Sequence, residues 1–170
     1  MKTFPLLTSA VIVIASFTLA FSSGASAAVT AEEFVHKASV GNEFEIESSK
    51  LALQRSQNPD VKQFAQQMID DHGKTADQLK TTLQSAGMDP SLATTRLDKK
   101  HQHTLDKLKA ASDSDFDSKY IDAQKDAHKE AVKMFHKYAK HGDNDALKNF
   151  AGQTLPTLKQ HKEHINQIKA

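Results

Sequence analysis

The sequence predicts an all-α protein, a bundle of four long helices with a short extra helix between the second and the third. Apolar residues recur at spacings of three, four and seven over four segments of about 27 residues, as on the buried face of a helix. Capping residues stand at the ends of these segments. The 170 residues include only six Gly and four Pro, too few for a turn-rich β fold.

The first residues have the pattern of a cleavable signal peptide. Lys2 supplies a positive charge, Phe4 to Phe21 is an apolar run, and Ala25-Ser26-Ala27 is a small-residue cleavage site. We expect cleavage after Ala27, with Ala28 as the alternative, and therefore export to the periplasm. A retained membrane anchor is disfavoured because the apolar run is short for a span. The chain then divides into a signal peptide, 1–27, and one helical-bundle domain, 28–170, with no further stretch suited to cross a bilayer.

The first two helices are predicted from their caps. Thr30-Ala31-Glu32-Glu33 is a capping box that begins a helix ending near Ser56. In Asn58-Pro59-Asp60, the Asn is the cap and the Pro takes the first position of the second helix. This helix runs to Ala86, and Gly87 ends it.

The second half of the chain holds the connector helix and two more long helices. The connector helix is expected from about Arg96 to Ala111, after a break at Asp89-Pro90. Asp113 to Asp115 caps the third long helix, which runs to His141-Gly142. Asp143 caps the fourth, which reaches the C-terminus.

The lengths of the connections predict how the helices are joined. Tight turns at Pro59 and Gly142 make each pair of helices antiparallel neighbours, whereas a middle connector of about 25 residues can return the chain along the bundle. This wiring makes the fold a ferritin-like four-helix bundle. A simple up-and-down bundle with the short helix packed outside fits the same spacing, so both wirings stay open at this point.

An ionisable residue stands at the centre of each apolar stripe. These residues are Glu45, His72, His128 and His161, and at 1.5 Å per residue they fall in the middle third of a bundle about 40 Å long. Asp117 lies about 16 Å from His128 along the axis and is not expected in the cluster. Burying such groups costs several kcal/mol unless they are paired or bound to a ligand.

Two interpretations of this cluster stay open. In the first, Glu45 pairs with a protonated histidine, and nearby hydroxyl and amide groups complete a closed hydrogen-bond network. In the second, three imidazoles and one carboxylate bind one transition-metal ion, Zn, Fe, Mn or Cu. The metal ligands would be Glu45, His72, His128 and His161, and the network partners Ser48, Thr75, Gln124, Thr154 and Thr157.

Composition and spacing argue against several other functions. The net charge of +1, with only two Arg among 22 basic residues, disfavours nucleic-acid binding. The absence of Cys removes thiol catalysis and disulfides. A ferroxidase centre needs Glu-x-x-His on two helices, but Ile69 and Lys125 stand three residues before His72 and His128. Ser48 lacks the strained turn of a hydrolase nucleophile, so no catalytic residue is predicted.

Four segments of the mature chain share the motifs of one protein family. They are Gly41-Asn42-Glu43-Phe44-Glu45-Ile46-Glu47 with Leu51-Ala52, Phe64-Ala65-Gln66-Gln67-Met68-Ile69-Asp70-Asp71-His72, Phe116-Asp117-Ser118-Lys119-Tyr120 with Ala127-His128, and Leu155-Pro156-Thr157-Leu158-Lys159-Gln160-His161. With them the chain resembles a bacterial family called domain of unknown function 4142. The resemblance implies an exported protein with a ferritin-like bundle, often labelled a predicted outer-membrane protein, and no established activity. The motifs fall on His72, His128 and His161, which the helical periodicity also selects.

The sequence thus predicts a non-enzymatic periplasmic bundle with a stress-related role and a central Glu/His cluster, for which the hydrogen-bond network and the metal site both stay open. One alternative is a metal-dependent redox enzyme that uses the same cluster. The other is a pH-responsive protein whose core imidazoles protonate in acid and loosen the bundle. No nucleic-acid partner is expected, and the sequence indicates neither a protein partner nor an oligomeric state.

Overall fold

The computed structural model describes residues 29–170, which form five α-helices and one short 3₁₀ turn. The long helices are α1 (Ala31–Arg55), α2 (Pro59–Ser85), α4 (Asp113–His141) and α5 (Asp145–Gln167), and the connector holds η1 (Pro90–Leu92) and α3 (Lys99–Lys109). The all-helical prediction is confirmed, since residues 29–170 contain no strand. The predicted signal peptide, 1–27, lies outside the described residues.

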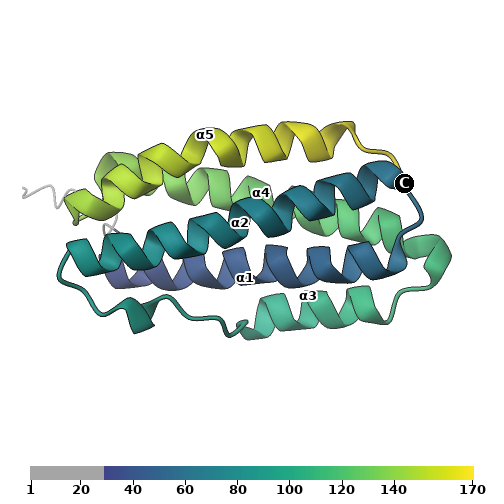
Figure 1. The fold of residues 1–170 in the computed structure, drawn as a ribbon, viewed down its shortest axis with the longest axis horizontal. Helices are drawn as coiled ribbons and strands as arrows, with labels where there is room; N and C mark the ends of the chain where they lie inside the picture. Colours follow the sequence, from purple (N-terminus) through teal and green to yellow (C-terminus); the bar gives the residue numbers. More distant parts are fainter. Residues whose placement is uncertain (1–28) are drawn as a thin grey trace, which may run out of the picture.

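The four long helices lie side by side, with α3 packed outside against α1 (Figure 1). Helix α1 packs on α2 and α4, and α5 packs on the same two helices, so the bundle is a ring of four. Helix α2 ends at the left of the view, and the connector returns along α1 to the right, where α4 begins. Each packed pair in the ring is therefore antiparallel. Among residues 29–170, no helix combines the length and hydrophobicity that a membrane span requires.

The first two long helices begin at the predicted caps. Thr30 Oγ1 accepts a hydrogen bond from the backbone N–H of Glu33 at 3.2 Å, and Asn58 Oδ1 accepts one from that of Asp60 at 2.9 Å. Helix α2 ends in a Schellman motif, because Met88 N–H donates to the carbonyl of Leu83. The backbone between them needs a positive φ, which Gly87 supplies at 69°.

The predicted starts of the other three helices are wrong by one to three residues. Helix α3 begins after Asp98 instead of at Arg96, because the Asp98 carboxylate accepts from the backbone N–H of His101 at 2.8 Å. Ser112, not an aspartate, is the N-cap of α4, and its side chain makes no capping bond. The cap of α5 is Asn144, which accepts from the N–H of Leu147 at 3.1 Å. The expected cap, Asp143, accepts instead from the Tyr138 hydroxyl at 2.9 Å.

Gly142 is required at the turn between α4 and α5 by a close approach and not by its backbone angles. A Cβ atom at this position would lie 2.6 Å from Cε1 of Tyr138. The Tyr138 ring is fixed, because it is 1% exposed and stacks on Phe34 with centroids 4.0 Å apart. An added methyl group therefore has no flexible neighbour to displace.

We expect Gly142→Ala to lower the free energy of unfolding by about 1–3 kcal/mol, the usual result of overpacking a well-filled site. Urea denaturation of the purified protein measures this difference. Gly152→Ala is the matched control, because a Cβ at Gly152 meets nothing within 4 Å. That change should stabilise α5 by about 0.5–1 kcal/mol, as Ala replaces Gly inside a helix. A Gly142→Ala protein as stable as the wild type would contradict the close approach.

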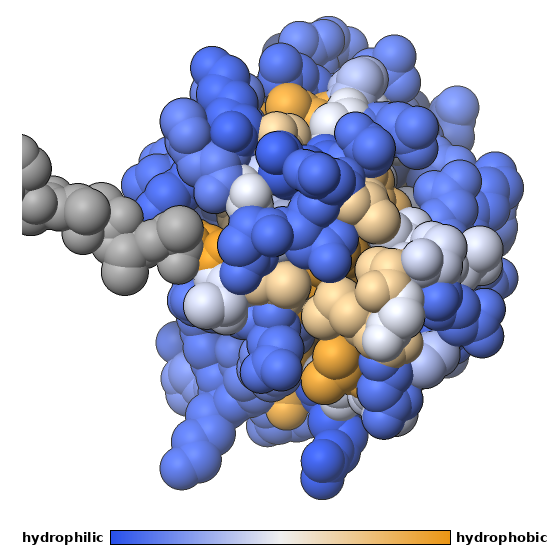
Figure 2. All heavy atoms as spheres, turned by 90° about the vertical axis from the view of Figure 1, so that its left-hand side faces the viewer, coloured by the Kyte–Doolittle hydropathy of each residue, from blue (hydrophilic) through white to orange (hydrophobic). Residues whose placement is uncertain are grey.

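The interior of the bundle consists of two apolar clusters with a polar layer between them. One cluster includes Phe64, Met68 and Tyr120, and the other includes Phe34 and Phe135. Figure 2 looks at the end of the bundle where α1 begins and shows several small apolar patches separated by hydrophilic side chains. Apart from Ser56, the C-cap of α1, the buried polar side chains come from within the long helices; they are Ser39, Asn42, Glu45, Ser48, Ser49, His72, Gln124, His128, Thr154 and His161.

Arg55 fastens the connector to the end of α1. Its guanidinium donates to the carbonyls of Leu108 at 3.0 Å and Ala111 at 2.8 Å, and it pairs with Asp113 at 2.7 Å. These carbonyls are at the end of α3, where no intrahelical donor remains for them. Arg55 therefore holds α3 against α1, beside the polar layer.

Candidate metal centre

Three histidines from three helices meet in the polar layer. His72 comes from α2, His128 from α4 and His161 from α5, and their exposed fractions are 3%, 0% and 1%. The ring centroids lie 5.8 Å apart for His72 and His128, and 5.5 Å apart for each of the other two pairs. One ring nitrogen from each histidine lies within 4.8 Å of the other two. These are the three histidines that the sequence predicts, and the structure brings them together.

One ring nitrogen of each imidazole faces an oxygen that can only accept a hydrogen bond. His72 Nδ1 lies 2.9 Å from Asn42 Oδ1, while Asn42 Nδ2 donates to the His72 carbonyl at 3.0 Å. His128 Nδ1 lies 2.9 Å from the backbone carbonyl of Gln124. His161 Nε2 lies 3.1 Å from Asp71 Oδ2. Because these oxygens accept, the proton of each neutral ring is on the nitrogen that faces them.

The second nitrogen of each ring therefore carries a lone pair. His72 Nε2, His128 Nε2 and His161 Nδ1 are buried and have no hydrogen-bond partner among residues 29–170. The predicted network partners bond elsewhere: Thr75 donates to the carbonyl of Asp71, and Ser48 to that of Phe44. No hydroxyl or amide of the described chain thus satisfies these three nitrogens.

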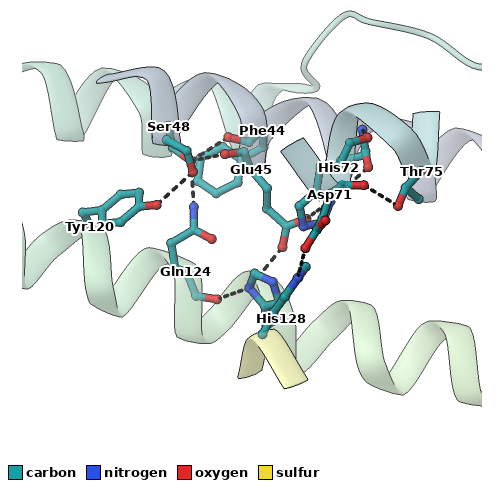
Figure 3. A network of polar contacts seen from close by, with 12 residues as sticks. Phe44, Glu45, Ser48, Asp71, His72, Thr75, Tyr120, Gln124 and His128 are labelled. Atoms are coloured by element: carbon teal, nitrogen blue, oxygen red, sulfur yellow. Dashed lines mark hydrogen bonds and ion pairs between the residues drawn. The ribbon is translucent and has the colours of Figure 1, made fainter. Parts of the chain in front are cut away.

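Glu45 lies on the proton-bearing side of two of the rings. Its Oε2 is 3.3 Å from His72 Nδ1, and its Oε1 is 3.2 Å from His128 Nδ1. Figure 3 shows Glu45 reaching from α1 toward both histidines. The group of clustered ligand atoms contains the three histidines and not this carboxyl. The structure therefore places Glu45 beside the histidine cluster, next to the bonds that orient the rings.

Burial decides the protonation states of this cluster. It raises the pKa of Glu45 to about 8 and lowers the pKa of His128 to about 4. It also holds the pKa of His72 well below the ordinary value, helped by the charges of the other two histidines, and lowers the pKa of His161. At neutral pH the imidazoles are neutral and Glu45 is mostly protonated, so its contacts with them are not ion pairs.

Two residues of the site were missed from the sequence, Asn42 and Asp71. Asn42 is next to the predicted stripe of α1, and Asp71 directly precedes His72. Burial raises the pKa of Asp71, but hydrogen bonds from His161 and Lys74 outweigh it and hold that pKa below the usual value. A carboxylate behind an imidazole fixes the ring and makes it a better metal ligand.

The donor set fits a transition-metal ion. Neutral imidazole is a ligand for Zn, Cu, Fe and Ni, and each of the three clustered rings has one buried nitrogen without a hydrogen-bond partner among residues 29–170. At metal–nitrogen distances of about 2.0–2.1 Å, tetrahedral geometry separates two nitrogens by about 3.4 Å. The present limit of 4.8 Å requires the rings to close by about 1.4 Å at most, a change within reach of small side-chain rotations.

Comparison with known proteins identifies the family of the chain. Residues 17–168 match the family model described as "Domain of unknown function (DUF4142)". The chain belongs to this family. This confirms the resemblance found from the motifs around the three histidines. No curated protein matches the DUF4142 chain significantly in sequence.

Two solved structures share the fold of this DUF4142 protein. One is "CopM in the Cu(II)-bound form", with a TM-score of 0.67 and 20% identity over 81% of this chain and 94% of that chain. The other is a DUF305 fragment from Deinococcus radiodurans, with a TM-score of 0.68 and 15% identity over 82% of this chain and 96% of that chain. At such identities the likeness concerns the helical fold alone.

Proposed function

We propose that this DUF4142 protein is an exported, non-enzymatic bundle that binds one Cu(II) ion through His72, His128 and His161. The observation that carries the proposal is the set of three buried ring nitrogens with lone pairs and no partner in residues 29–170. A buried polar atom without a partner destabilises the fold by about 1–3 kcal/mol, and the histidine cluster holds three such atoms. Binding one metal ion would satisfy all three.

The chemistry of the donors favours copper. The chain has no Cys, so a soft thiolate site is excluded. Mn²⁺ and Mg²⁺ prefer oxygen ligands, and non-haem Fe(II) sites combine two histidines with a carboxylate, whereas Glu45 lies outside the clustered ligand atoms. Of the remaining divalent ions, Cu(II) binds a given nitrogen site more tightly than Zn(II). The Cu(II)-bound CopM structure, which has the same helical fold, supports this choice.

Export and wiring are part of the same proposal. Lys2, the apolar run that follows it and Ala25-Ser26-Ala27 support a cleaved signal peptide and a periplasmic location. The connector that returns along the bundle in Figure 1 supports the ferritin-like wiring. In this proposal the stress-related role of the protein is to limit free copper outside the cytoplasm.

A redox enzyme that uses the same site is the second candidate. Three protein ligands leave one coordination position of the metal for a substrate, as in catalytic metal sites. This observation favours an enzyme as the alternative function. Turnover of added reductant and oxygen by the copper-loaded protein distinguishes it from a binding protein. Multiple turnovers that disappear with His128→Ala would replace the first proposal by the second.

The direct test is titration of the chelator-treated protein with Cu(II). We expect one ion per chain, with splitting from three nitrogens in the electron paramagnetic resonance spectrum. Ligand at about 100 times its Kd stabilises the folded state by about 2.7 kcal/mol, which raises the Tm of a chain this long by roughly 10 °C. No Tm shift with Cu(II), Zn(II), Mn(II) or Fe(II) would remove the metal proposal. It would favour the structural or pH-responsive alternative.

A further inference from the structure

A pocket of 410 Å³ opens beside the histidine cluster. Residues of all five helices line it, and its residues become less exposed toward the inside. The Lys100 side chain is 62% exposed, that of His101 is 18% exposed, and Glu45 is 2% exposed. The volume lies in the range of about 300–1,000 Å³ that is usual for small-molecule sites.

The walls of the pocket are apolar between its opening and its inner end. Val40 of α1, Ala127, Ala131 and Met134 of α4, and Leu158 of α5 line this part. The two alanines are small and partly exposed, so they leave space that larger side chains would fill. Such walls suit the apolar body of a small organic molecule.

Glu45 and His72 stand at the inner end of the pocket. Glu45 Oε1 is buried and makes no hydrogen bond among residues 29–170, since the proton of its neighbour His128 Nδ1, 3.2 Å away, is donated to the Gln124 carbonyl. The neighbouring polar groups are already bonded, because Asn42 makes two bonds with His72 and Thr75 donates to Asp71. A ligand hydroxyl can both donate and accept, so it can pair with Glu45 in either protonation state.

The outer end of the pocket attracts anions. Four lysines line it, and two of them are neutralised, Lys37 by Glu33 and Lys100 by Glu130. Lys133 and Lys137 stand one turn apart on α4. Neither forms an ion pair within residues 29–170. The lining carboxylates Asp98 and Glu130 are bonded to His101 and Lys100, so the charge of Lys133 and Lys137 favours a carboxylate at the opening.

We propose that this pocket binds a small amphipathic hydroxycarboxylate. Its carboxylate lies against Lys133 and Lys137, its apolar body lies between α1 and α4, and its hydroxyl pairs with Glu45 Oε1. The unpartnered Glu45, the apolar walls and the two lysines carry this inference together. Of the three clustered histidines only His72 lines the pocket, so the pocket is present in the metal-free protein.

The test is calorimetric titration of the chelator-treated protein with 3-(4-hydroxyphenyl)propanoate. We expect one molecule per chain. Ala131→Phe, which fills the pocket, should weaken binding by about tenfold or more, or about 1.4 kcal/mol. Ala127→Leu on the same wall gives the same result with a smaller side chain, should the Phe variant fail to fold. Ala123→Phe is the matched control, because Ala123 is on the same helix and does not line the pocket.

Two further experiments test how the carboxylate and the hydroxyl of the ligand are bound. The double variant Lys133→Ala/Lys137→Ala should bind about fivefold more weakly and lose most of the salt dependence, since exposed charges contribute modestly. Lys129→Ala/Lys140→Ala removes the same charge from α4 outside the pocket and should leave binding unchanged. 3-Phenylpropanoate, which lacks the hydroxyl, should bind wild type more weakly than the hydroxylated probe.

The outcomes separate this proposal from the copper proposal. His161→Ala should lose the copper effect and keep the probe, because His161 does not line the pocket and its hydrogen bond goes to Asp71, whereas Ala131→Phe should do the reverse. Absence of probe binding to wild type at about 10 mM would overturn the pocket proposal, since that limit corresponds to a very weak site. Binding that both Ala131→Phe and Ala127→Leu leave unchanged would overturn it as well. Neither result would affect the copper site.

Discussion

His128→Ala is expected to abolish the stabilisation of the protein by Cu(II). His128 supplies one of three ligand atoms and is fully buried, so its removal leaves two imidazoles in the cluster. Substitution of a residue that hydrogen-bonds to a metal ligand weakens metal binding by about 10- to 100-fold. Loss of the ligand itself should exceed about 100-fold, which removes the Tm rise at near-stoichiometric metal. Thermal unfolding with and without one equivalent of Cu(II) measures the effect.

The control for this prediction is His141→Ala, which removes an exposed imidazole at the end of the same helix. It should leave both the copper-dependent Tm rise and the stoichiometry at the wild-type values. His72→Ala should behave like His128→Ala. A His128→Ala protein that keeps the full Tm rise would show that copper stabilises the bundle from some other site.

Helical periodicity was sufficient to predict the long helices, because each helix buries a continuous apolar stripe. The end of a helix depends on single side chains, and there the sequence was ambiguous. Asp143 and Asn144 are both good caps. The Tyr138 hydroxyl donates a hydrogen bond to the Asp143 carboxylate, and Asn144 caps α5. That choice depends on where a buried ring lies, which the local sequence does not contain.

The same limit applies to the candidate site. The stripes predicted that His72, His128 and His161 lie at similar heights, and the structure brings them together. The nitrogen that stays free in each ring is decided by the hydrogen bond that the other nitrogen makes. That bond goes to another helix for His72 and His161, and to the preceding turn of α4 for His128. Asp71, for example, lies 90 residues from its partner His161. Asp71 stands next to His72 on α2 but bonds to His161 on α5, so no spacing rule along the chain could pair Asp71 with His161.

The position of Glu45 also could not be derived from periodicity. Its stripe fixes its height and direction, but a shift of a few ångströms decides whether a carboxyl is a ligand or lies behind one. In the structure it lies within 3.3 Å of the protonated side of two imidazoles. Both placements satisfy the same apolar pattern. The difference has a measurable consequence, because a buried carboxyl without a cationic partner affects stability in a pH-dependent way.

Glu45→Gln is expected to stabilise the metal-free protein increasingly as the pH rises from 5 to 8. Burial raises the pKa of Glu45 to about 8, whereas in the unfolded chain this carboxyl has the ordinary glutamate pKa of 4.5. The stability associated with the protonated carboxyl is complete below about 4.5 and is lost as the pH rises toward 8. Gln has a similar shape and does not ionise between pH 5 and 8. The stability difference between variant and wild type should therefore grow by about 2–4 kcal/mol over this range.

Urea denaturation of the chelator-treated proteins at pH 5, 6, 7 and 8 measures this difference. The three histidines have lowered pKa values and destabilise the fold as the pH falls below about 6.5, but they are present in both proteins and largely cancel. Glu47→Gln, on the solvent side of α1 beside Lys50, is the control and should run parallel to wild type. If Glu45→Gln also runs parallel to wild type, Glu45 is ionised in the folded protein. It would then form ion pairs with the histidines beside it.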